Sequence, residues 1–137
     1  MLIPKKTKFK KQFKGKLKGK TVKSSQIRFG NYAIKAIENG RITSQQLEAV
    51  RRNIVRKMGR LGKLWVRVFP DTPITSKPNE VRMGKGKGKV DFWAVKIKQG
   101  QILYEVSGIF EAEALKIFIG SAKKLPVKVK FVKKLGL

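Results

Sequence analysis

A ten-residue stretch of alternating glycine and lysine constrains the fold of this chain more than any other part of it. It covers residues 81–90 and reads VRMGKGKGKV. Glycine loses the most backbone freedom on ordering, so this spacing weakens helices and strands, and the lysines leave nothing apolar to bury. Exposed backbone N–H groups and positive charge together suit a polyanion. The same residues also fit a solvated hairpin tip that binds nothing.

The whole chain carries a large excess of positive charge. Its 137 residues include 34 Lys and Arg against 8 Asp and Glu, a formal net charge of +26. Because 41% of the residues are hydrophobic, we expect one domain with a core, which would repel itself unless a partner supplied negative charge. Nucleic acid and anionic membrane are the abundant polyanions. The basic residues do not gather on one amphipathic helix, so nucleic acid is favoured over a membrane.

The residue inventory argues against catalysis. The chain has no cysteine and no histidine, so thiolate and imidazole chemistry is excluded, and we predict no metal site and no cofactor. The carboxylates are scattered, and Glu111 and Glu113 would diverge on a helix. The glycine run fits neither G-x-x-x-x-G-K-[ST] nor G-x-G-x-x-G, and it precedes a predicted strand instead of opening a helix. We therefore predict that the protein is not an enzyme.

No apolar run approaches the roughly 20 residues that a membrane span needs, and the start of the chain has no hydrophobic segment typical of a secretory signal. We expect no membrane association and no targeting peptide.

Residues 1–25 are interpreted as a basic N-terminal arm. Phe9, Phe13 and Leu17 recur every four residues, as on a helix face, but the intervening glycines at 15 and 19 weaken a helix. We predict an extended, mostly irregular arm whose Phe side chains anchor it on a partner or on its own domain. A disordered tail that only adds charge is the alternative.

Residues 26–137 predict a single RNA-binding domain of the α+β class, an antiparallel-rich sheet with two helices packed on it as a sandwich. Strands are expected at 27–37, 64–69, 90–97, 102–106 and 127–132, with turns at 39–40 and 71–73 and a loop at 76–90. Thr43 and Gln46 form a capping box for a helix over about residues 44–60, and a second helix covers about 111–124. The predicted buried stripes are Leu47, Val50, Ile54, Met58 and Leu61 on the first helix and Leu115, Phe118, Ile119 and Ala122 on the second.

Two further groups of side chains have two possible roles each. The basic residues of the first helix that lie off its stripe are either solvated or seated on phosphates. Trp65, Phe69 and Trp93 either stack on bases or fill the core, and the core is favoured because a domain of this size has few other large side chains.

Several longer motifs follow one another along nearly the whole chain. They are LIPKKTKFKKQFKGK, FGNYAIKA, GRITSQQLEAVRR, RLGKLWVRVFPDTPITSKPNEVRMGKGKG, VDFWAVKI and ILYEVSG. With these motifs the chain resembles the bacterial and organellar L-sixteen family of large-ribosomal-subunit proteins, whose archaeal and eukaryotic counterpart is L-ten-e. It departs from family habit at Phe13, where many bacterial members have His, and at Phe110, where Pro is common.

The resemblance implies a structural protein of the large subunit, bound to its ribosomal RNA beside the aminoacyl-tRNA site, with neighbouring large-subunit proteins as partners and no homo-oligomer. The arm and the loop would reach toward tRNA, help to position it and support late subunit assembly. A bacterial, plastid or mitochondrial ribosome is expected, the organellar locations being suggested by lysine-rich composition. The expected RNA and tRNA contacts are Lys5, Lys6, Lys8, Lys10, Lys11, Arg51, Arg52, Arg56, Arg82, Met83, Gly84, Lys85, Gly86, Lys87, Gly88 and Lys89.

A different class of function fits the charge as well. A free-standing basic protein could coat DNA or lie on an anionic membrane. Sedimentation separates the two hypotheses, because only a ribosomal protein co-migrates with large subunits at moderate salt.

Overall fold

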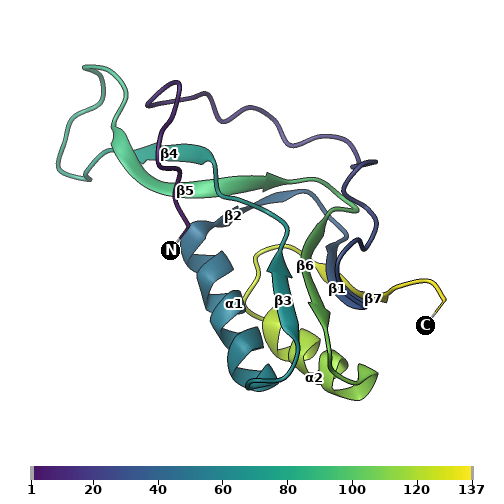
Figure 1. Cartoon of the computed structure of the whole chain (residues 1–137). Helices are drawn as coiled ribbons and strands as arrows, with labels where there is room; N and C mark the ends of the chain where they lie inside the picture. The colour runs from purple at the N-terminus through teal and green to yellow at the C-terminus, as the bar shows by residue number, and fades with distance from the viewer. Residues whose placement is uncertain (1, 137) are drawn as a thin grey trace.

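The computed structural model describes residues 2–136, which form two helices and seven strands in two sheets (Figure 1). One sheet has the order β3-β6-β1-β7 and the other the order β2-β5-β4, and all pairs of strands are antiparallel. The predicted α+β class is confirmed. The elements are β1 (Tyr32–Ala36), β2 (Gly40–Thr43), α1 (Ser44–Met58), β3 (Lys63–Val66), β4 (Thr72–Ser76), β5 (Lys89–Ile97), β6 (Ile102–Ser107), α2 (Glu111–Ala122) and β7 (Val129–Lys133).

Helix α1 forms as its sequence predicts. The Thr43 hydroxyl accepts a hydrogen bond from the Gln46 backbone N–H (3.2 Å), and the Gln46 side chain accepts one from the Thr43 N–H (3.0 Å), so the capping box is present. The helix ends at Gly59, whose positive φ of 65° favours glycine. The predicted stripe is buried from Leu47 to Met58, but Leu61 lies past the helix end and is exposed, so that part of the prediction was wrong.

Helix α2 buries a different face from the one predicted. Leu115 and Ile119 are exposed, whereas Ala114, Ile117 and Ser121 are buried. The helix has apolar side chains of its own on more than one side, so their spacing alone does not show which side is buried. The small side chains of Ala114 and Ser121 lie on the buried face and allow a close approach to the rest of the core.

The three-stranded sheet contains two strands that were not predicted. The turn expected at 71–73 is instead the start of β4, in which Pro73 lies opposite Trp93 of β5. Proline is tolerated there because β4 is an edge strand and needs no second ladder of hydrogen bonds. Strand β2 was read as a turn followed by a helix cap. Strand β5 pairs with β2 on one side and β4 on the other, so the loop predicted at 76–90 joins two neighbouring antiparallel strands, to which its end residues Ser76, Lys89 and Val90 belong.

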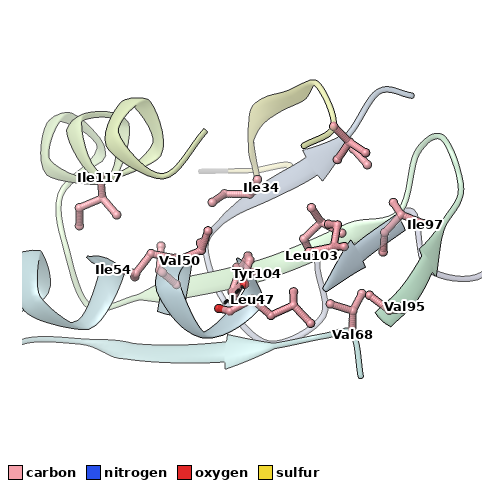
Figure 2. Packing of buried hydrophobic residues seen from close by; sticks show 14 of the residues in the cluster. Ile34, Leu47, Val50, Ile54, Val68, Val95, Ile97, Leu103, Tyr104 and Ile117 are labelled. Carbon is pink, nitrogen blue, oxygen red and sulfur yellow. Dashed lines mark hydrogen bonds between the residues drawn. The ribbon is translucent and has the colours of Figure 1, made fainter. Parts of the chain in front are cut away.

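One hydrophobic core joins both sheets to the helices. Figure 2 shows Leu47, Val50 and Ile54 of α1 on the side of β6 toward which Tyr104 points. The Tyr104 hydroxyl is buried and donates a hydrogen bond to the Leu47 carbonyl (2.9 Å), which satisfies the only polar atom of that side chain. Ile42, Val95 and Ile97 of the three-stranded sheet belong to the same core, so this sheet packs against α1 and gives the loop a firm base.

Candidate nucleic-acid interface

The glycine–lysine loop, residues 76–90, projects from the end of the β4–β5 hairpin, away from both helices (Figure 1). Its chain reverses through three consecutive residues of positive φ: Gly84 (100°), Lys85 (60°) and Gly86 (90°). A side chain at either glycine would meet no atom within 4 Å, so these glycines serve the backbone conformation and not close packing. The Met83 side chain is 96% exposed.

The loop encloses an open hollow of about 550 Å³ with a basic lining that includes Lys77, Lys85, Lys87 and Lys89. The Lys77 ammonium donates a hydrogen bond across the loop to the Gly84 carbonyl, which braces the turn. Asp91 is the carboxylate that also lines the hollow. The hollow therefore has a strong excess of positive charge.

The basic arm, residues 1–25, meets the loop at Lys87. The Lys87 ammonium donates to the Gln12 carbonyl (2.6 Å) and lies 5.7 Å from the centre of the Phe13 ring. In return the Lys11 ammonium donates to the Lys87 carbonyl (3.1 Å). Figure 1 shows the two segments side by side at one end of the molecule. Two basic segments separated by more than 70 residues in the sequence thus form one surface.

Further along, the arm lies against the three-stranded sheet. The Arg41 guanidinium of β2 donates to the carbonyls of Lys14 (3.3 Å) and Gly15 (2.9 Å). The Thr21 N–H then donates to the Gln99 carbonyl (3.0 Å) at the turn after β5. The arm is therefore attached mainly through its own backbone, and its lysine side chains are exposed, although the Lys11 ammonium also contacts the loop.

The remaining arm lysines predicted as contacts, Lys5, Lys6, Lys8 and Lys10, are exposed. Lys8 lies 5.5 Å from the centre of the neighbouring Phe9 ring. None of the four ion pairs found among residues 2–136 involves the arm or the loop. Within the described chain, the charge of both segments has no acidic partner.

The arginines of α1 form a separate basic surface. Glu48 pairs with Arg51 (2.5 Å) and Arg52 (3.1 Å), while Arg52 and Arg56 line a hollow of about 240 Å³ with Lys124. The hydrogen bond from Arg51 outweighs burial and, with Arg52, lowers the pKa of Glu48 from 4.5 to about 2. The structure does not bring these arginines to the hollow of the loop.

Sequence reasoning missed the buried carboxylate of Glu105. Burial raises its pKa, but four hydrogen bonds outweigh burial and hold the pKa below its ordinary value. The donors are the backbone N–H groups of Arg28 (2.9 Å), Phe29 (2.7 Å) and Gly30 (3.0 Å) and the Arg67 guanidinium (2.9 Å). The one available signal was a single acidic residue inside the apolar strand ILYEVS.

Two of the aromatic side chains assigned to the core lie at its margin. Trp65 is half-buried and stacks on Phe29 with ring centres 6.0 Å apart and planes 20° apart. Phe69 is exposed, so its assignment to the core was wrong. Trp93 is half-buried. The core is filled instead by Tyr104 and branched aliphatic residues.

Residues 4–132 match the family model described as Ribosomal protein L16p/L10e. The chain belongs to this family. Three bacterial relatives are each called large ribosomal subunit protein uL16. The protein of Thioalkalivibrio sulfidiphilus is 52% identical over 132 residues, which cover 96% of both chains. Those of Bartonella henselae and of Chelativorans sp. are 50% and 49% identical over 136 residues, which cover 99% of each chain.

Membership of the L16p/L10e family makes this chain a structural ribosomal protein and not an enzyme. Among residues 2–136, no acidic side chains gather in a group of three or more that could hold a metal ion. Neither helix in that part of the chain is long and apolar enough to cross a membrane.

Proposed function

We propose that this chain is a structural constituent of the large ribosomal subunit that binds large-subunit ribosomal RNA and contacts tRNA beside the aminoacyl-tRNA site. The junction between arm and loop carries this proposal. It joins two basic segments into one surface that has no acidic partner within residues 2–136. Ribosomal RNA supplies the missing negative charge. The family and the named relatives, which are large-subunit ribosomal proteins, support the same location.

The loop is the part that we assign to tRNA. It projects from a rigid hairpin, its left-handed turn is built on glycines, and its exposed side chains are mostly basic. A rigid base holds such a loop in position, while the loop itself adds little to the core. The proposed contacts in the loop are Arg82, Met83, Gly84, Lys85, Gly86, Lys87, Gly88 and Lys89.

The arm and α1 are assigned to ribosomal RNA. Backbone attachment of the arm leaves its ammonium groups available for phosphates. On α1, Arg52 and Arg56 are more available than Arg51, which is held by two hydrogen bonds to Glu48. The proposed contacts are Lys5, Lys6, Lys8, Lys10, Lys11, Arg51, Arg52 and Arg56.

In this proposal residues 1–25 act as an arm and residues 26–137 as one RNA-binding domain. The protein occupies its subunit as a single copy among neighbouring ribosomal proteins. The positive charge of the arm and the loop is fully neutralised only by RNA that has already folded. Both segments therefore bind the RNA at a late stage of subunit assembly. The ribosome is bacterial or organellar, and the three named relatives are bacterial.

The test is the salt dependence of binding to a large-subunit RNA fragment. Wild-type protein should bind with a steep slope of log affinity against log salt, about 0.7–0.9 for each phosphate neutralised. Replacing Lys85, Lys87 and Lys89 together by Ala should reduce the slope by about 2 and leave thermal unfolding nearly unchanged. A matched control removes the same charge elsewhere, with Lys116, Lys123 and Lys128 replaced by Ala.

A wild-type slope of only one or two phosphates would refute the ribosomal RNA assignment. Equal effects of the loop variant and the control would show that total charge matters and the loop does not. Subunits reconstituted with the loop variant should also bind aminoacyl-tRNA more weakly than subunits with the control. If those two subunits bound tRNA equally, the assignment of the loop to tRNA would be wrong.

A further inference from the structure

The face of the four-stranded sheet opposite the helices carries a second surface, distinct from the arm and the loop. Strand register places Trp65, Glu105, Ala33 and Val132 in one row across this outer face. The neighbouring row includes Tyr104, whose hydroxyl bonds α1, so it faces the helical layer. In this row Glu105 and Ala33 are buried, whereas Trp65 and Val132 are half-buried. The chain segment that precedes β1 covers Glu105, to which residues 28–30 donate three hydrogen bonds.

Phe29 forms a fixed aromatic platform on this outer face. Its side chain is 59% exposed, yet the residue is held from two sides. Its ring stacks on Trp65 and lies 6.0 Å from the Arg67 guanidinium, and its backbone N–H donates to the buried Glu105 carboxylate (2.7 Å). These contacts restrict the motion of the Phe29 side chain, so little conformational freedom is lost when a planar ligand stacks on its exposed surface.

A basic hollow lies on the same outer face. The Arg67 guanidinium donates to the Gln26 carbonyl (2.7 Å), and Gln26 lines a hollow of about 430 Å³ together with Lys35 and Lys134. The nearby carboxylates leave most of this charge uncompensated. Glu105 pairs with Arg67. Lys133 also borders the hollow, but it lies opposite Tyr32 in the row that faces the helices, and its ammonium pairs with Glu111 of α2 (3.5 Å).

We propose that this outer face binds a short unpaired segment of RNA, with one base stacked on Phe29 and a phosphate of the segment in the hollow lined by Lys35 and Lys134. The inference rests on the proposed ribosomal RNA function and adds a site to it. Aromatic side chains recognise splayed bases by stacking, and lysines beside them hold the sugar-phosphate backbone. The positive flanks favour RNA over a protein partner, since a protein interface is generally depleted of charge at its centre.

The probe is a large-subunit RNA fragment, together with a short single-stranded oligoribonucleotide and the same oligonucleotide without its bases. Phe29→Ala should weaken binding of the oligoribonucleotide about 5- to 100-fold, as removal of one base–aromatic stack does. The loss should disappear with the base-free oligonucleotide, because only phosphate contacts remain. Phe29→Trp should restore binding. Phe110→Ala is the matched control, since Phe110 is 80% exposed at the N-cap of α2.

The two proposals fail in different ways. Steep salt dependence with the RNA fragment, combined with equal affinities of wild type and Phe29→Ala, would overturn the nucleotide site and leave the ribosomal RNA function standing. A shallow wild-type slope would overturn both. In reconstituted subunits, loss of a cross-link to a neighbouring protein without any change in RNA affinity would assign the platform to a protein and refute the nucleotide site. Circular dichroism of each variant checks that the fold is retained.

Discussion

The strongest prediction about the fold concerns Glu105, because its carboxylate joins three parts of the chain. It has no exposed surface, and each of its oxygens accepts two hydrogen bonds. Glu105→Ala leaves three backbone N–H groups without their acceptor, and the nearly buried guanidinium of Arg67 loses its carboxylate and keeps only the Gln26 carbonyl. Removing one member of a buried ion pair costs about 3–5 kcal/mol, which is a large part of the stability of a single domain.

The measurement is urea unfolding followed by tryptophan fluorescence, with thermal unfolding beside it. A loss of about 3–5 kcal/mol lowers the midpoint temperature of a domain of this size by roughly 10–20 °C. Glu105→Gln should lose about 2–4 kcal/mol, because its amide nitrogen faces two donors that no longer have an acceptor. Glu111→Gln is the control, and removal of its exposed pair with Lys133 should cost less than about 1 kcal/mol.

The same carboxylate contributes a pH dependence whose sign is known. Its pKa is lower in the folded chain than its ordinary value of 4.5, so its stabilisation is complete above pH 4.5 and is lost as the pH falls through the folded pKa. The difference in unfolding free energy between wild type and Glu105→Gln should therefore shrink on acidification. A loss below about 1 kcal/mol for Glu105→Ala, or a difference that does not vary with pH, would refute the reasoning.

Two further predictions concern one glycine pair and one surface carboxylate. Gly59→Ala should lower the free energy of unfolding by about 1–2 kcal/mol, because of its positive φ alone. Gly62→Ala should cost about 1–3 kcal/mol more in urea unfolding, because its Cβ would lie 2.2 Å from the Ser107 carbonyl oxygen. Equal losses for the two variants would contradict this packing. Glu48 should titrate by NMR at a pKa of about 2, so the stabilisation by its pair with Arg51 is present above pH 4.5 and is lost toward pH 2. Arg51→Ala should raise the pKa of Glu48. A titration midpoint of Glu48 that does not change in this variant would contradict the assignment.

Local patterns predicted the first helix well and the second less well, for a physical reason. The capping box and the stripe of α1 lie within one short segment, and one side of that helix is clearly polar. Helix α2 has apolar residues on more than one side, so only the position of the neighbouring elements decides that Ile117 is buried and Ile119 is exposed. Strand β4 was missed because Pro73, which usually favours a turn, lies on a sheet edge.

Contacts between distant segments were beyond the reach of the sequence pattern. The alternation of glycine and lysine predicted an exposed basic loop, but nothing in it indicates that Lys87 meets Gln12 of the arm. Likewise, no spacing rule connects Glu105 with the N–H groups of Phe29 and Gly30, which lie about 75 residues away in the sequence. Family motifs gave the setting of these residues, and only the fold shows which of them meet.

The arm and the loop are held together without a carboxylate between them, which suits the RNA binding that we propose for both. At the junction of arm and loop, the ammonium groups of Lys11 and Lys87 donate to backbone carbonyls and not to carboxylates. A carbonyl satisfies the donor but leaves the positive charge in place, so two like-charged segments lie together while both stay attractive to phosphate. Their repulsion is screened beyond about 8 Å at physiological salt and grows at low salt. Carboxylates at this junction would stabilise the free protein and would also compete with RNA for the same lysines.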